Sequence, residues 1–295
     1  VGGFKNNLAN GFGKQEEPDG TWWEGEIKND KLNGKAIYVT SRGDRYEGIF
    51  KDGLLHGQGT YTTTKGTNVT GEFKKDLLNG QGRWEYPGGD VATGNFKDDQ
   101  LDGYGIFIWA NGDKYEGEWL DGIRTGKGKY YHHEGGYYEG NFFKDKREGK
   151  GKFIYSDGDI YIGTFKNNLY HGKAEYTYSN GNKYIGSFEK NYENGYGVFT
   201  WTDGDKYEGE WLDGIRTGKG KYTYESGTVY EGEFKDNYSE GNGTITYDYG
   251  DKYVGEFSDG LEHGKGTLEY KNGNKYIGQF DKGYLHGKGK MVYAN

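Results

Sequence analysis

Aromatic residues and glycines alternate along this chain in two short runs that return at a fixed spacing. The run from Tyr115 to Trp119 carries rings at both ends with Gly117 between them, and glutamates fill the other positions. The next run, Gly126 to Tyr130, alternates glycine and tyrosine with lysine. Because successive side chains of a β-strand point to opposite faces, each run predicts a strand with one face of rings and glycines and one charged face.

The two runs form a unit of 23 residues that fills the whole chain. Residues 115–130 return letter for letter at residues 207–222, which is four units further on. Numbered from its leading residue, each unit has glycine at positions two and eleven in all thirteen copies. A helix is excluded, because glycine at this density would cost about 0.8–1.0 kcal/mol per residue relative to alanine. The leading residues stand at positions 23, 46, 69, 92, 115, 138, 161, 184, 207, 230, 253 and 276.

Glycine pairs predict where the strands turn. Asn111-Gly112 and Asp203-Gly204 lie between units, and such pairs favour two-residue hairpins in which both residues have positive φ. Inside a unit, stretches such as Lys51 to His56 predict a longer turn, with a Leu or Ile against the sheet edge. The fold class predicted is all-β: an elongated, single-layer antiparallel β-meander of about thirteen hairpin repeats, shaped as a twisted trough or rod. We expect one continuous domain over residues 1–295, trimmed at both ends.

Composition narrows the class of protein. Of 295 residues, 57 are glycine and 18% are aromatic, while only 32% are hydrophobic, so rings must replace a thick aliphatic core. The absence of cysteine removes disulfides and thiolate metal sites and is compatible with a reducing compartment. The net charge of −8 argues against nucleic acid and anionic lipid as main partners. No apolar run approaches the length of a membrane-spanning helix.

The run Tyr115 to Trp119, followed by Gly126-Lys-Gly128 and preceded by Asn111-Gly112, resembles the membrane occupation and recognition nexus repeat, or MORN repeat. The resemblance covers the whole chain. It implies a single-layered β array without catalytic activity, of the kind found in radial spoke heads of cilia, in protist cytoskeletal collars, in junctional membrane proteins and beside lipid kinases. An uninterrupted array is most similar to the ciliary and protist cytoskeletal members.

Motifs that suggest chemistry have simpler explanations in the repeat. The stretch from Gly122 to Gly128 lacks the spacing of a phosphate-binding loop, and no strand-to-helix context follows. Asp157-Gly-Asp159 could hold calcium weakly, but it lies in the turn column, where Asp-Gly suits the geometry. A column of histidines, His56, His171, His263 and His286, could bind zinc, but a polar turn residue is the simpler interpretation. We therefore expect no enzyme activity, no catalytic residue, no metal and no cofactor.

The rings are expected to serve as core and, where one layer cannot cover them, as a binding surface. An exposed apolar strip marks an interaction site, and Tyr, Trp and Arg are favoured anchors. The two copies of the best-preserved unit, with their Asp-Gly-Ile-Arg turns, predict two like contacts on an elongated partner. The predicted partner-binding residues are Trp109, Tyr115, Trp119, Arg124, Trp201, Tyr207, Trp211 and Arg216.

These observations predict a non-enzymatic scaffold that holds a segment of a partner protein along its aromatic trough, in a ciliary axonemal assembly similar to a radial spoke head. The expected location is cytoplasmic and cytoskeletal. The alternative is a phospholipid-associated scaffold that tethers a cytoskeletal or junctional complex. Pairing of open edge strands leaves a homodimer open. Where two leading rings are lost in succession, at Val69 and Ala92, we expect a looser or bent sheet.

Overall fold

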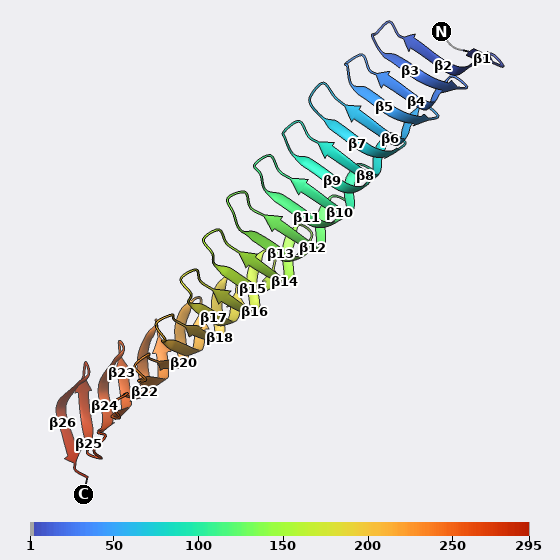
Figure 1. Ribbon diagram of the computed structural model, residues 1–295. Coiled ribbons are helices and arrows are strands. Elements are labelled where there is room, and N and C mark those ends of the chain that lie inside the picture. Colours follow the sequence, from blue (N-terminus) through green and yellow to red (C-terminus); the bar gives the residue numbers. More distant parts are fainter. Residues whose placement is uncertain (1–2, 295) are drawn as a thin grey trace. The chain divides into compact units, whose positions relative to one another are not determined.

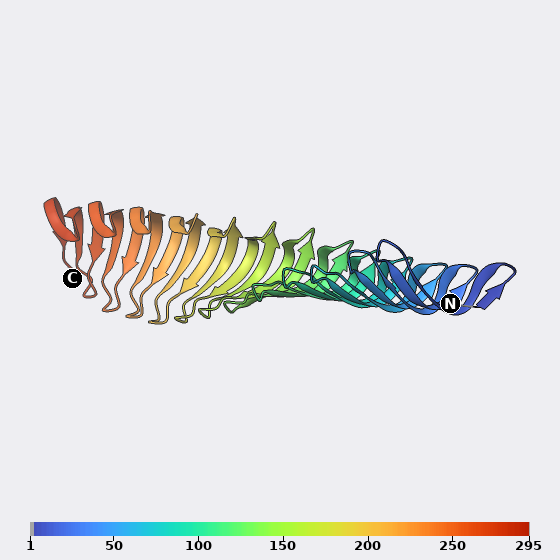
Figure 2. The same ribbon diagram turned by 90° about the horizontal axis from the view of Figure 1, so that it is seen from above.

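The computed structural model describes residues 3–294, which contain 26 β-strands and no helix. Each strand belongs to an antiparallel hairpin, and the hairpins follow one another in sequence order, as the colours in Figure 1 show. Figure 2 shows curved strands in a single layer within each part of the chain. The predicted all-β, single-layer antiparallel meander of 23-residue repeats is therefore confirmed. The chain divides into two units, residues 1–146 and 147–295; the single continuous domain stays a prediction.

The first unit, described from residue 3, holds thirteen strands, and each pairs with the next. The strands are β1 (Gly3–Lys5), β2 (Leu8–Glu16), β3 (Trp22–Lys28), β4 (Lys31–Val39), β5 (Arg45–Lys51), β6 (Leu54–Thr62), β7 (Asn68–Lys74), β8 (Leu77–Glu85), β9 (Val91–Lys97), β10 (Gln100–Ile108), β11 (Lys114–Leu120), β12 (Ile123–Tyr131) and β13 (Tyr137–Phe143).

The second unit, described to residue 294, continues the pattern, again with each strand paired to the next. Its strands are β14 (Lys146–Ile154), β15 (Ile160–Lys166), β16 (Leu169–Thr177), β17 (Lys183–Glu189), β18 (Tyr192–Thr200), β19 (Lys206–Leu212), β20 (Ile215–Thr223), β21 (Val229–Lys235), β22 (Tyr238–Thr246), β23 (Lys252–Ser258), β24 (Leu261–Glu269), β25 (Lys275–Asp281) and β26 (Tyr284–Val292).

The tight turns lie inside the repeats, not between them, which corrects the turn assignment made from the sequence. Between β11 and β12 the whole connection is Asp121 and Gly122, with φ of 47° and 75°. Two successive positive φ values define the two-residue turn that matches strand twist. Between repeats the turn is longer: Gly112 donates to the carbonyl oxygen of Trp109 at 2.8 Å, and the φ of Gly112 alone is positive, at 92°. The Leu or Ile after the tight turn, such as Ile123, is exposed.

The tight turns also tie each repeat to the preceding one. Asp76 donates its backbone N–H to the carbonyl oxygen of Leu55 at 3.0 Å, and its carboxylate accepts the backbone N–H of Leu55 at 2.7 Å. Where glycine occupies this turn position, as at Gly122, the backbone bond to Leu101 remains at 2.9 Å. A ladder of backbone hydrogen bonds therefore fixes the spacing of the repeats within each unit.

Rings lying over glycines form the core. Tyr115 is fully buried, and a Cβ on Gly128 would lie 2.3 Å from its hydroxyl oxygen, so only glycine leaves room for the ring. The same hydroxyl donates to the carbonyl oxygen of Glu118 at 3.2 Å. Edge-to-face contacts then join Tyr115 to Trp119 in its own repeat and to Phe142 in the next, both with ring centres 5.0 Å apart. The predicted packing of rings over glycine is confirmed.

In the repeats where the leading ring is missing, leucine from the second strand lies over the glycines, as Leu55 does in the repeat led by Tyr46. In the repeat that begins at Val69, a Cβ on Gly71 or Gly82 would lie 2.9 or 2.8 Å from the Leu78 side chain, which is fully buried. Leu101 covers Gly105 in the same way in the following repeat. Strand pairing continues unbroken from β7 to β10. The looser sheet expected here has no counterpart in the packing.

Candidate interaction surface

Four of the eight predicted partner-binding residues are core residues. Tyr115 and Tyr207 have 0% of their surface exposed, and Trp119 and Trp211 have 7%. The Trp119 indole donates to the carbonyl oxygen of Gly105 at 3.1 Å, so its one donor is also used. The expectation that these rings are open is corrected. The glycines beside them leave room for the rings to pack in the core, where a partner cannot contact them.

The other four predicted residues are half-buried and form two similar clusters. In the first unit, Arg124 lies over four rings, among them Trp109 at 5.7 Å and Tyr115 at 5.6 Å. Its guanidinium also bonds the Asp145 carboxylate at 3.0 Å. In the second unit, Arg216 lies over Trp201, Tyr207 and Tyr222, and donates to a backbone carbonyl oxygen at 2.9 Å. The structure thus brings the predicted residues of each copy together.

A continuous row of rings runs along each unit at the ends of its second strands and in the loops that follow them, and the sequence analysis missed it as a row. We call the part in the second unit the aromatic ridge. Neighbouring ring centres along it are 4.4 to 6.5 Å apart, so each ring contacts the next. The signal was present in two aromatic columns, fifteen and seventeen residues after each leading position. The ridge consists of the half-buried Tyr155, Tyr176, Tyr178, Phe199, Trp201 and Tyr222 and the exposed Tyr224, and it begins at the buried Phe153.

The first unit has a shorter row of the same kind, with ring centres 4.8 to 6.1 Å apart. Its members are Trp84, Tyr86, Phe107, Trp109, Tyr130 and His132. Both rows lie on the ring face of their unit, the face that also carries the buried leading residues, which are tyrosines in the repeats of the ridge and Val69, Ala92 and Tyr115 in the repeats of the shorter row.

Carboxylates at the loops hold the outer rings in place. Asp113 accepts the Tyr130 hydroxyl at 2.7 Å and both the backbone N–H and the ring of His133, at 2.9 and 2.8 Å. Burial alone would raise the pKa of Asp113, but these hydrogen bonds outweigh it and hold the pKa well below its ordinary value. Burial, together with Asp113, raises the pKa of Tyr130 to about 12. In the second unit, Asp159 and Asp205 accept Tyr176 and Tyr222, both at 2.5 Å.

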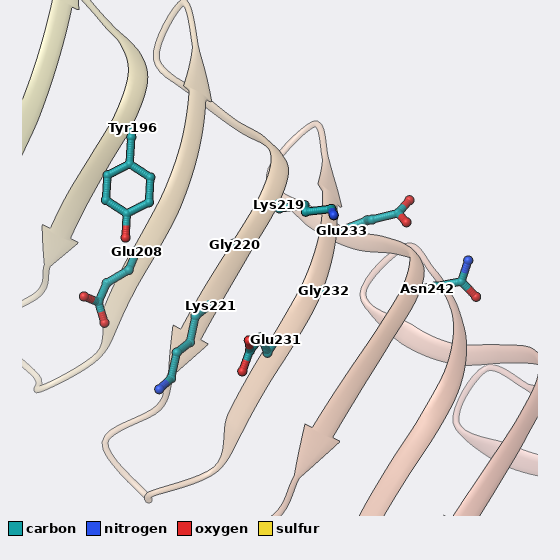
Figure 3. Close-up of a pocket in the computed structure, with 9 residues that line it drawn as sticks. All are labelled: Tyr196, Glu208, Lys219, Gly220, Lys221, Glu231, Gly232, Glu233 and Asn242. Carbon is teal, nitrogen blue, oxygen red and sulfur yellow. The ribbon is translucent and has the colours of Figure 1, made fainter.

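The opposite, charged face has a different character. An open hollow there is lined by residues of five successive strands, β18 to β22 (Figure 3). Lys219 and Lys221 lie among Glu208, Glu231 and Glu233, with Tyr196 at one side. Acids and bases alternate around this hollow, and elsewhere on the same face of the second unit Ile162, Ile185 and Val254 are exposed.

Among residues 3–294, no group of three or more His, Asp or Glu side chains is placed to hold a metal ion. His263 in the histidine column instead lies 3.5 Å from Asp281. Over the same residues there is no helix long and apolar enough to cross a membrane.

A repeated β-hairpin with a fixed spacing, glycine columns and a row of half-buried rings defines a class of β repeat proteins. The family model of the MORN repeat matches the whole chain, and the chain belongs to this family. The matched segments are residues 1–22, 23–45, 46–68, 70–91, 93–114, 115–137, 138–160, 161–183, 184–206, 207–229, 230–252, 253–275 and 276–295.

Solved structures with some likeness include a mutant of the TCP10 domain of Danio rerio CPAP, with 13% identity and a TM-score of 0.38, over 68% of this chain and 97% of that chain. Another is the TCP domain of Drosophila melanogaster SAS-4 (dCPAP), in complex with a proline-rich motif of Ana2 (dSTIL), with 14% identity and a TM-score of 0.33, over 55% and 85%. A comparison with curated proteins finds no match. At these identities and TM-scores the solved structures give no information on function, which is inferred from the geometry of this chain.

Proposed function

We propose that this protein is a non-enzymatic scaffold that binds an extended segment of a partner protein along the aromatic ridge and the corresponding shorter row of rings in the first unit. The observation that carries the proposal is the unbroken contact of half-buried rings from one repeat to the next. A row of that kind exposes apolar surface in a line, and such surface is where protein partners bind.

Of the eight partner-binding residues predicted from the sequence, four remain proposed contacts and four are assigned to the core. Trp109 belongs to the shorter row and Trp201 to the ridge, and Arg124 and Arg216 lie over their rings, so these four are proposed contacts. The buried Tyr115 and Tyr207 pack against Trp119 and Trp211. These two tryptophans in turn contact Phe107 and Phe199 of the rows, with ring centres 6.2 Å apart.

We place this scaffold in a cytoskeletal assembly, and in the finer form of the proposal in the ciliary axoneme, as in the radial spoke heads whose repeats it resembles. An uninterrupted series of thirteen repeats supports a role in spacing and holding partners. The net charge of −8 weighs against the alternative of an anionic membrane surface as the main partner.

Paired variants of the two faces test the proposal. The double variant Tyr178→Ala and Trp201→Ala removes two ridge rings, and Glu208→Ala with Lys221→Ala alters the charged face as a matched control. Affinity purification from ciliated cells should recover a stoichiometric partner with wild type and the control but not with the ridge variant. Circular dichroism checks that both variants fold. Equal recovery with all three proteins would exclude the ridge as the binding surface.

A further inference from the structure

The spacing of the aromatic ridge selects the conformation of the bound segment. Each repeat contributes two strands about 4.8 Å apart, so equivalent rings recur about every 9.6 Å along the unit. Three residues of a polyproline II helix, which form one turn, advance about 9.3 Å. Every third residue of such a segment would therefore meet the same ring of successive repeats, with about 1 Å of mismatch over three steps.

Other conformations fit this spacing less well. Two turns of an α-helix advance about 10.8 Å, which gives about 4 Å of mismatch over the same three steps. Side chains on one face of an extended strand recur about every 6.7 Å, out of step with the rings. Proline rings also stack readily on aromatic side chains, as in other aromatic-lined grooves that recognise polyproline II segments.

Charge beside the ridge indicates the second property of the segment. Five successive loops, residues 155–159, 178–182, 201–205, 224–228 and 247–251, contain no lysine or arginine, and all of them except 178–182 contain at least one acidic residue. Asp157, Asp203, Glu225 and Asp248 are exposed there. The guanidinium of Arg216, which lies over Trp201, is directed to the carbonyl oxygen of Asn237. An acidic border complements a segment that carries lysine or arginine between its prolines.

We propose that the aromatic ridge, from Tyr155 to Tyr224, binds a basic, proline-rich segment of a partner protein in the polyproline II conformation. This inference rests on the proposed function and adds the chemistry and conformation of the partner segment. Prolines stack on Tyr178, Trp201 and the neighbouring ridge rings, and basic side chains reach the acidic loops.

A synthetic peptide tests this on the full chain. Four Pro-Pro-Arg triplets form a polyproline II helix of about 37 Å, close to the span of four repeats. Binding is followed by fluorescence anisotropy of the labelled peptide. A peptide of four Ala-Ala-Arg triplets has the same charge and length but no polyproline preference, and four Pro-Pro-Glu triplets reverse the charge. The first peptide should bind at least about tenfold more tightly than either control.

Variants of the chain locate the binding. Trp201→Ala should weaken binding of the Pro-Pro-Arg peptide about tenfold, whereas Tyr196→Ala, on the charged face and 64% exposed, should leave it unchanged. Equal binding of the Pro-Pro-Arg and Ala-Ala-Arg peptides, or no effect of Trp201→Ala, overturns the inference. If the ridge variants lose the natural partner but its bound segment is helical or lacks proline, the proposed function stands and this inference fails.

Discussion

The guanidinium of Arg124 lies 5.7 Å from the ring centre of Trp109, fifteen residues before it, and Arg216 and Trp201 repeat the distance. The link joins the loop of one repeat to the second strand of the next. Elsewhere in the column the loop residue is tyrosine: the Tyr178 hydroxyl donates to Glu193 at 3.0 Å. At this contact, neighbouring repeats therefore carry complementary residues: arginine with tryptophan at two places and glutamate with tyrosine at a third.

The residue in the tight turn of the following repeat also depends on whether arginine or glutamate lies at this contact. Asp145 bonds Arg124, whereas Gly214 occupies this turn position beside Glu193, where a Cβ would lie 3.4 Å from the Glu carboxylate. Arg124→Glu should therefore be destabilising with Asp145 present and less so in an Asp145→Gly background. The difference should be about 0.2–1 kcal/mol, the scale of partly exposed charge pairs. A double-mutant cycle by urea unfolding measures it, and equal costs in both backgrounds would refute the match.

Alanine at Gly128 should be strongly destabilising, because its Cβ would lie 2.3 Å from the hydroxyl oxygen of Tyr115. Overpacking of this kind costs about 1–3 kcal/mol. Gly88, in a loop, is the control: a Cβ there would meet no atom within 4 Å. Gly88→Ala should be neutral or slightly stabilising. Thermal unfolding of the two variants checks this, and similar melting temperatures would contradict the packing of rings over glycine.

Leu78 and Leu77 are neighbours in sequence with opposite environments. Leu78 is 0% exposed and lies over the glycines of its repeat, whereas Leu77 is 38% exposed. Leu78→Ala should cost about 2–5 kcal/mol, the range for buried leucine, and Leu77→Ala much less. Hydrogen exchange of β7 to β10 should rise only in the first variant. High exchange there already in the wild type would instead support the looser sheet that the sequence suggested.

Asp113 should make stability depend on pH. Its pKa is lower in the folded chain than its ordinary value of 3.8, so its contribution is present above that value and is lost as pH falls below it. Asn182 and Asn274 accept the corresponding backbone hydrogen bond in other repeats, so Asp113→Asn preserves the loop. The variant should lose less stability than wild type between about pH 4 and pH 2. Parallel pH profiles would show that Asp113 is not responsible.

The sequence predicted the strands because a period of two is direct evidence of side-chain alternation. It misplaced the tight turn, since Asn111-Gly112 suits either of two turn types, and only the hydrogen bond from Gly112 to Trp109 shows that the connection is longer. The turn pairs inside repeats, such as Lys75-Asp76, look unremarkable in sequence yet both residues have positive φ.

The candidate surface was predicted in part. Column analysis shows which rings share a face, but not how deep each lies. Tyr115 packs into the space above Gly128, while Trp109, the first residue after β10, has no glycine beneath it and stays half-buried. Depth depends on the pairing of Tyr115 with Tyr130 across strands, and this register is a property of the folded sheet.

Site-specific photo-crosslinking tests the central claim most directly. A benzophenone amino acid replaces Trp201 on the ridge or Tyr196 on the charged face, and each protein is irradiated with its native partner bound. We predict a single crosslinked adduct from position 201 and none from position 196, with the crosslinked partner residues in one short segment. Adducts from position 196 alone would contradict the assignment of the ring face as the binding surface.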